Sequence, residues 1–276
     1  MAKKKMENTI VIIGLGQLGR VFAGGFLRAG FTVVPVNRGD DLDIVVARVP
    51  APALVLVAVA ENDLQPVLAA LPPAWKGCIG LIQNELLPRD WQRHDIENPT
   101  VIPVWFEKKK GTDAKPLISS PVYGPAADAV LRALRAIDLP CHSLESAEAL
   151  LFELVRKNLY ILTTNLAGLR TGGTVGELWD SNRDLALTVA DEVLGIQDWL
   201  TGQQNVRDSL LRGMAEAIAA DPQHLCTGRS APARLTRSLA LADQGGIAVP
   251  TLRSISQNLP PLNRVYSAAI GGGAVD

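Results

Sequence analysis

The apolar positions of the chain follow two different patterns, which meet near residue 145. Before this point, short apolar runs alternate with stretches of helical periodicity, and the clearest run is Ala-Leu-Val-Leu-Val-Ala-Val at 53–59. Such continuous runs are typical of parallel strands that are buried on both faces. After Leu144 the apolar residues recur at helical spacing, without another run of comparable strand character. The pattern predicts an α/β domain over 1–145 and an all-helical domain over 146–276.

The bounds of single elements follow from the same pattern and from the prolines and glycines. Strands are expected at 9–13, 31–36, 53–59, 78–82, 100–106, 117–122 and 139–144. Helices are expected at 17–29, 62–71, 125–137, 146–169, 184–200, 206–220 and 231–244. Pro72-Pro73 ends the second helix, and Ser143 or Ser146 caps the fourth. Only residues 39–52 separate the second strand from the third, which leaves room there for one small element.

A glycine-rich turn joins the first expected strand to the first expected helix, with the sequence Gly14-Leu15-Gly16-Gln17-Leu18-Gly19. In this setting Gly14 makes the tight turn, Gly16 lets the backbone approach a pyrophosphate, and Gly19 lets helix and strand pack closely. The phosphates would bind at the helix N-terminus, where free N–H groups and the helix dipole favour anions. We interpret the turn as a dinucleotide site; the alternative is a glycine turn in an ordinary α/β domain.

The end of the second expected strand indicates which dinucleotide is bound. An NAD site usually places an acidic residue there for the ribose 2′-OH, whereas this chain has Asn37 and Arg38, and acids follow only at 40–41. An arginine can form charge-assisted hydrogen bonds to a 2′-phosphate. We therefore predict NADP(H) rather than NAD, with Ala58 and Val59 at the end of the third strand also contacting the cofactor. The alternative is that Arg38 is a solvated loop residue.

A polar stripe runs along the helix expected at 146–169. Glu153, Lys157, Ile161 and Asn165 are spaced by four and share one helix face, among apolar neighbours. The stripe either faces solvent or forms the wall of a cleft. In a cleft, Lys157 would polarise a carbonyl and deliver a proton, and the Asn165 amide would hold a carboxylate or hydroxyl of the substrate. Glu153, one turn earlier, would be an ion-pair partner of Lys157.

Six segments spread over residues 9–251 have the order and spacing of one enzyme family. They are the glycine turn, Arg38, Gln83-Asn84-Glu85, Val122-Tyr123-Gly124-Pro125, Arg156-Lys157 with Asn165, and Gly246-Ile247-Ala248-Val249-Pro250. On these residues the chain resembles the ketopantoate reductases, which are NADPH-dependent enzymes. The resemblance implies an N-terminal Rossmann domain and an all-helical domain similar to the C-terminal domain of 6-phosphogluconate dehydrogenase.

The resemblance also implies roles for single residues. Arg38 would bind the 2′-phosphate, and Asn84 would lie beside the nicotinamide and contact the substrate. Lys157 would be the catalytic lysine and Asn165 a substrate ligand. Ser230 stands at the position of a substrate-contacting glutamate of the family.

Four positions depart from the family pattern. Ala60 replaces a lysine after the third strand, Ile161 replaces an asparagine one turn beyond Lys157, Ser230 replaces the glutamate, and Glu85 replaces a glycine. The cofactor half of the site is therefore better kept than the substrate half.

Composition narrows the class of protein. The chain has 276 residues, of which 47% are hydrophobic and 20% charged, and its net charge of −1 argues against a nucleic-acid binder. Cys78, Cys141 and Cys226 are far apart and show no metal-ligand spacing, which favours a reducing compartment and no metal. No apolar stretch is long enough to span a bilayer. We expect a cytoplasmic protein with a small-molecule substrate, and a homodimer is compatible with the sequence.

Three functions remain open on the sequence. The first is an NADPH-dependent oxidoreductase that transfers hydride to a small 2-keto acid or related carbonyl, with Lys157 as general acid and with Asn84 and Asn165 orienting the substrate. The second is an NADP(H)-binding sensor or regulatory protein that has lost catalysis. The third is a hydroxy-acid or imine dehydrogenase on the same fold, in which Arg229 and Arg234 bind an acid group; a helix-surface role is the alternative for both arginines.

Overall fold

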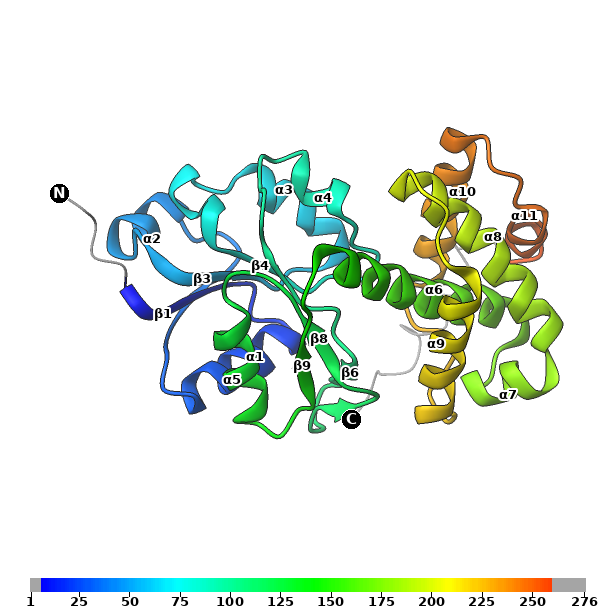
Figure 1. The fold of residues 1–276 in the computed structure, drawn as a ribbon, viewed down its shortest axis with the longest axis horizontal. Helices are drawn as coiled ribbons and strands as arrows, with labels where there is room; N and C mark the ends of the chain where they lie inside the picture. The colour runs from blue at the N-terminus through cyan, green and yellow to red at the C-terminus, as the bar shows by residue number, and fades with distance from the viewer. Residues whose placement is uncertain (1–5, 260–276) are drawn as a thin grey trace, which may run out of the picture. The chain divides into compact units, whose positions relative to one another are not determined.

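The computed structural model describes residues 6–259 (Figure 1). Its first unit is built on a five-stranded sheet in which every pairing is parallel and the order is β2-β1-β3-β4-β5. The strands are β1 (Met6–Ile13), β2 (Thr32–Val36), β3 (Pro52–Val57), β4 (Ile79–Leu81) and β5 (Thr100–Val101). The chain moves outward from β1 to β2 and then crosses to the other side of β1 at β3. Ligands of open parallel sheets bind at such a reversal, at the carboxyl ends of the strands.

Helices cover both faces of this sheet. They are α1 (Gln17–Arg28), α2 (Leu42–Arg48), α3 (Leu64–Ala69), α4 (Pro88–Gln92) and α5 (Ala127–Arg135), with the 3₁₀ helices η1 (Glu61–Asp63) and η2 (Pro73–Cys78). Figure 1 shows α1 and α5 below the sheet and α3 and α4 above it. The backbone of α1 approaches α5 so closely that a Cβ at Gly25 would lie 2.6 Å from the Ala133 carbonyl oxygen. The short α2 is the single small element expected between the second and third strands.

One of the expected strands is interrupted and another is shortened. Residues 100–106 contribute only β5 and the start of β6 (Phe106–Glu107), which pairs antiparallel with β7 (Lys115–Pro116). Residues 117–122 contribute β8 (Ser120–Val122), which pairs in parallel with β9 (Cys141–Ser143). Pro103 explains the first break, because proline has no N–H to donate to a strand ladder. Instead, the backbone N–H of Trp105 donates to the Ser120 hydroxyl at 2.9 Å.

The long helix α6 (Ala147–Thr171) begins as expected at a serine. The Ser146 hydroxyl accepts a hydrogen bond of 3.1 Å from the Ala149 backbone N–H, which is the N-cap contact. Internal contacts divide the chain within this helix, at Tyr160, and they assign 200–220 to the first unit as well. The first unit therefore includes α9 (Arg207–Ala220). The predicted division at 145–146 marks the point where strands end and helices begin. That it is also the boundary between two domains stays a prediction.

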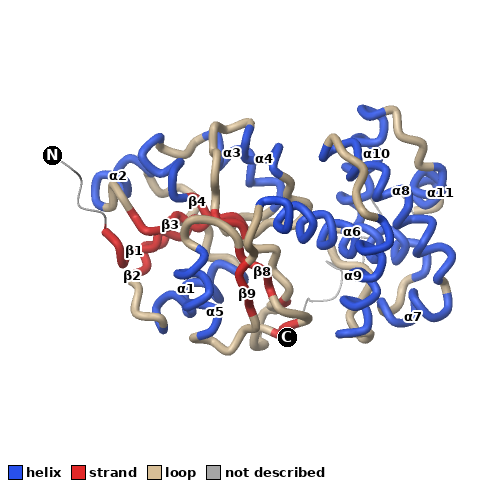
Figure 2. The backbone as a smooth tube through the Cα atoms, in the orientation of Figure 1, coloured by secondary structure: helices blue, strands red, loops and turns tan. Residues whose placement is uncertain are grey.

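The second unit consists of 161–199 and the described residues from 221 to 259. Besides the end of α6, it contains α7 (Val175–Ser181), most of α8 (Arg183–Thr201), α10 (Ala231–Gly245) and α11 (Pro250–Gln257). Figure 2 shows strands only in the earlier part of the chain, and from Leu144 to Leu259 the structure contains no strand. Within 6–259, no helix combines the length and the apolar character that crossing a membrane requires.

Candidate functional site

The glycine turn has the backbone geometry that its sequence predicts. Gly14 has φ +93°, and a Cβ there would lie 3.0 Å from the Ala58 carbonyl oxygen. A Cβ at Gly19 would overlap the Gly14 carbonyl oxygen, so that the first turn of α1 packs directly on the strand end. Gly16, the N-cap residue of α1, behaves differently, because a Cβ there would meet no protein atom within 4 Å. The backbone is therefore bare and accessible at the helix N-terminus, where a phosphate would bind.

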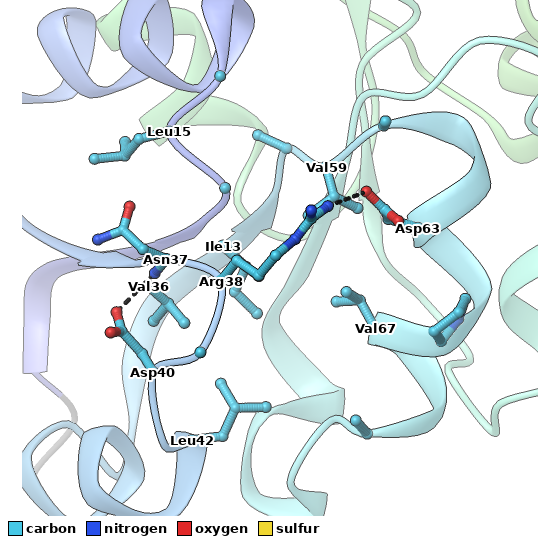
Figure 3. Close-up of a pocket in the computed structure, with 17 residues that line it drawn as sticks. Ile13, Leu15, Val36, Asn37, Arg38, Asp40, Leu42, Val59, Asp63 and Val67 are labelled. Atoms are coloured by element: carbon cyan, nitrogen blue, oxygen red, sulfur yellow. Dashed lines mark hydrogen bonds and ion pairs between the residues drawn. The ribbon is translucent and has the colours of Figure 1, made fainter.

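A cavity of about 510 Å³ opens in front of this turn at the carboxyl ends of β1, β2 and β3 (Figure 3). Its walls are residues 13–16, the loop 36–40 with Leu42, residues 58–60, and Asp63 with Pro66, Val67 and Ala70 around α3. The predicted cofactor residues in these walls are Gly14, Leu15, Gly16, Asn37, Arg38, Ala58 and Val59. Gln17, Leu18 and Gly19 lie in the first turn of α1, and Asn84 follows β4; these four are not part of the lining.

Arg38 extends from the loop after β2 into the mouth of the cavity. Its guanidinium forms an ion pair of 3.2 Å with the Asp63 carboxylate, and the two side chains are 91% and 48% exposed. The carboxylate of Asp40 accepts a 2.7 Å hydrogen bond from the backbone N–H of Asn37 and so shapes the same loop. Arg38 is the only basic side chain among the residues that line this cavity.

The loop after β4 is tied to the end of β3 by the buried Gln83, for which the sequence predicts no role of its own. The Gln83 amide donates to the Val57 carbonyl at 2.8 Å and accepts from the Ile82 N–H at 3.1 Å. The next residue, Asn84, donates to the Glu61 carboxylate of η1 at 3.1 Å. A polar residue directly after a buried apolar strand was the available signal for Gln83.

Glu85 completes this loop with φ +61°, in the left-handed region. The family pattern has glycine at this position. The backbone conformation that favours glycine is therefore kept here, although the side chain differs.

Lys157 lies inside the first unit and not on a wet helix face. Its side chain is buried, and its Nζ lies 4.1 Å from the centre of the Trp105 ring, a cation–π contact. The solvent-facing interpretation of the stripe is therefore wrong at Lys157. The neighbouring Asn158 donates to the Leu86 carbonyl at 3.4 Å, which fastens this part of α6 to the loop that carries Asn84.

The ion pair found for Glu153 involves Arg156 rather than the lysine one turn later. The two side chains approach to 3.3 Å, and Arg156 also reaches the Gly213 carbonyl at 3.2 Å and the Glu216 carboxylate at 3.3 Å on α9. These contacts hold α9 to the first half of α6.

In the second unit, Asn165 is held by contacts at both ends of its amide. The amide nitrogen donates to the Cys226 carbonyl at 2.8 Å, and the amide oxygen accepts from Arg234 at 2.6 Å. Arg234 is buried, so that the helix-surface role expected for it is wrong, whereas Arg229 is exposed. Ser230 is exposed at the start of α10, one helical turn before Arg234, and its hydroxyl makes no capping bond. Ile161 is buried on α6.

The described residues include no cluster of metal ligands, and the thiols of Cys141 and Cys226 are not activated. Among residues 6–259, no three His, Cys, Asp or Glu side chains cluster as a metal site would require. Burial raises the pKa of the Cys226 thiol to about 11, with a further contribution from Glu177, and burial also raises the pKa of Cys141. Both thiols stay protonated at neutral pH and lack the thiolate that reactivity requires.

Neither a sequence model of a protein family nor a curated protein sequence matches the chain. Solved structures match it over nearly its whole length. A ketopantoate reductase from Ralstonia eutropha JMP134 is 16% identical with a TM-score of 0.63, and the match covers 90% of this chain and 96% of that one. A 2-dehydropantoate 2-reductase from Methylococcus capsulatus is 13% identical with a TM-score of 0.65, over 96% and 98% of the two chains.

A structure described as a dimeric ketopantoate reductase from Staphylococcus aureus is 16% identical with a TM-score of 0.59, over 90% and 98%. At such identities the likeness concerns the fold. The match spans both the parallel sheet and the helices that follow it. The chain therefore has the fold of the ketopantoate reductases, a Rossmann domain followed by a helical domain.

Proposed function

We propose that the protein is an NADPH-dependent oxidoreductase of the ketopantoate reductase family, which reduces a small 2-keto acid or a related carbonyl compound. One observation carries the proposal: a single cavity at the reversal point of the sheet is lined by both the bare glycine turn and Arg38. The turn offers backbone N–H groups to a pyrophosphate, and Arg38 offers a guanidinium to a 2′-phosphate. These residues fit a dinucleotide with a phosphorylated ribose.

When bound, NADPH would supply a hydride to the carbonyl carbon of the substrate. The electron pair of the C=O bond then moves to oxygen, and the Lys157 ammonium gives a proton to that oxygen. Burial against Trp105 restricts the position of Nζ. The Asn158–Leu86 hydrogen bond holds the helix of Lys157 beside the loop of Asn84, and the Asn84 amide would orient the substrate.

Asn165 and Ser230 are proposed substrate ligands on the family resemblance. The two bonds of the Asn165 amide, to Cys226 and Arg234, leave one N–H and one lone pair for such a contact. The Ser230 hydroxyl makes no capping bond and is exposed. The cytoplasmic location stays a prediction.

A lysine replacement tests the proposed chemistry. In Lys157→Ala, kcat for NADPH oxidation with a reactive 2-keto acid should fall by about 10²–10⁴-fold, while the Kd of NADPH stays unchanged, because the general acid is lost and the cavity is intact. Lys109→Ala, which removes an exposed lysine of the same unit, is the control. Turnover at the wild-type level in Lys157→Ala, across every substrate accepted, would refute the role of Lys157.

The second candidate function is an NADP(H)-binding sensor without catalysis. It is favoured by Ala60, which lines the cavity where the family has lysine, and by Ile161, which is buried and apolar where the family has asparagine. The sensor would be favoured by tight NADPH binding with no NADPH oxidation by keto acids or imines and no NADP⁺ reduction by hydroxy acids.

We also propose a homodimer, because the Staphylococcus aureus relative is described as dimeric. Sedimentation velocity at micromolar concentration tests it. A sedimentation coefficient that corresponds to 29.5 kDa at all concentrations would contradict the dimer.

A further inference from the structure

The cavity wall carries negative charges beside Arg38, and they oppose the binding of a 2′-phosphate. The charged side chains among the lining residues are Arg38, Asp40 and Asp63. One positive charge therefore stands against two negative charges. The positive charge is already engaged, because the Arg38 guanidinium lies 3.2 Å from the Asp63 carboxylate.

The two acids occupy different places. In Figure 3 the Arg38 side chain reaches across the cavity from the loop after β2 to Asp63 at the end of η1. Asp40 points instead toward its own loop, where it accepts the hydrogen bond from the backbone N–H of Asn37. Asp63 is therefore the acid that competes with an incoming anion for Arg38.

The ion pair is of a kind that a ligand can break. Both side chains are substantially exposed, and exposed ion pairs contribute little to stability because water and salt screen them. A phosphate dianion at the 2′ position would attract the guanidinium more strongly than a single carboxylate does. It would then stand close to an Asp63 carboxylate that has lost its partner, and the two like charges repel. A 2′-hydroxyl, as in NADH, meets neither effect.

We propose that Asp63 is a specificity-determining residue, which weakens the binding of 2′-phosphorylated nucleotides by holding Arg38 and thereby reduces the discrimination between NADPH and NADH. This inference rests on the proposed function, since it concerns the coenzyme of that same cavity. The carboxylate that reduces the discrimination between NADPH and NADH is that of Asp63, on the opposite wall of the cavity from Arg38.

Calorimetric titration of Asp63→Asn with two fragments tests the inference without turnover. Adenosine 2′,5′-bisphosphate carries the 2′-phosphate, and 5′-AMP lacks it. Asparagine keeps the size of the side chain and its ability to accept from Arg38, but removes the charge. We expect the bisphosphate to bind about three- to tenfold more tightly to Asp63→Asn at low ionic strength, and 5′-AMP to change by less than about twofold.

Asp41→Asn is the matched control. It removes the same charge three residues from Arg38, at a position that is not in the cavity lining, and asparagine can keep the N-cap bond that the Asp41 side chain accepts from the Asp43 N–H. This variant should bind both fragments as the wild type does. In an Arg38→Ala background, the gain from Asp63→Asn should shrink to about twofold or less, because only the repulsion remains to be removed.

Equal gains from Asp41→Asn and Asp63→Asn would overturn the inference, since general charge would then explain the effect. An unchanged or weaker bisphosphate affinity in Asp63→Asn would overturn it as well. If the wild type shows no preference for the bisphosphate but Asp63→Asn acquires one, the inference holds. The prediction that the wild type prefers NADP(H) to NAD(H) is then wrong. If neither protein binds any adenine nucleotide, both the inference and the proposed function fail.

Discussion

Arg38 and Lys157 are the two cations on which the proposed activity depends, and the fold holds them in opposite ways. Arg38 is 91% exposed and paired with an aspartate that water also reaches, so that it can exchange this partner for a ligand. Lys157 is buried and lies over the face of Trp105. An exposed cation is suited to binding, whereas a fixed and buried one is suited to delivering a proton to one place.

Three glycine replacements separate binding from folding. Gly16→Ala should leave the free energy of unfolding within about 0.5 kcal/mol of the wild type, because its Cβ meets no protein atom, but should weaken NADPH binding at least about tenfold by blocking the pyrophosphate. Gly19→Ala should lose both stability and binding, because its Cβ overlaps the Gly14 carbonyl oxygen.

Gly24→Ala, in the middle of α1 with open space around its Cβ, is the control and should stabilise by about 0.5–1 kcal/mol without affecting binding. Urea unfolding and fluorescence titration measure the two effects. Normal NADPH affinity in Gly16→Ala would contradict the placement of the pyrophosphate at the turn.

At the scale of elements, the long periodic helices could be predicted from the sequence, whereas several short helices were missed. The helix expected at 146–169 is α6 (Ala147–Thr171), and that expected at 231–244 is α10 (Ala231–Gly245). No helix was expected at 175–181, yet α7 forms there, and Thr174 and Glu177 make a capping box at its start. The short α4 and α11 were missed as well; each starts at a proline, at Pro88 and Pro250, which suits a first helical turn.

The helix α11 depends on an acid that is distant in sequence. The buried Glu192 carboxylate accepts from the backbone N–H groups of Thr251 at 2.7 Å and Leu252 at 2.9 Å. Glu192→Ala should therefore destabilise the protein by about 1–3 kcal/mol, because a charge-assisted cap at a helix N-terminus is lost.

In Glu192→Ala, amide hydrogen exchange should become faster in α11. The increase should be smaller in Glu192→Gln, which keeps one side-chain oxygen as an acceptor. Asp180→Ala, which removes an exposed acid from α7, should change neither quantity. Unaltered exchange in α11 of Glu192→Ala would show that the cap does not hold this helix.

At the scale of the whole molecule, the carboxyl ends of β1, β2 and β3 form the cavity to which we assign the cofactor, and the sequence pattern was sufficient to place the glycine turn and Arg38 at these strand ends. The glycine turn and Arg38 lie in one cavity because local sequence determines both strand ends. Contacts between distant segments were beyond such reasoning. Three such contacts join residues that lie 25 to 69 positions apart: Arg38 with Asp63, Asn165 with Arg234, and Arg156 with Glu216 on α9. The periodicity of apolar residues carries no information about pairs at these separations.

The central claim, that this cavity binds NADPH through Arg38, is tested most directly by fluorescence titration of the wild type and Arg38→Ala with NADPH and with NADH. We expect the wild type to bind NADPH at least about threefold more tightly than NADH, since Asp63 moderates the preference, and Arg38→Ala to lose that preference by weakening NADPH alone. Equal affinity of the wild type for the two coenzymes, or unchanged NADPH affinity in Arg38→Ala, would contradict the account.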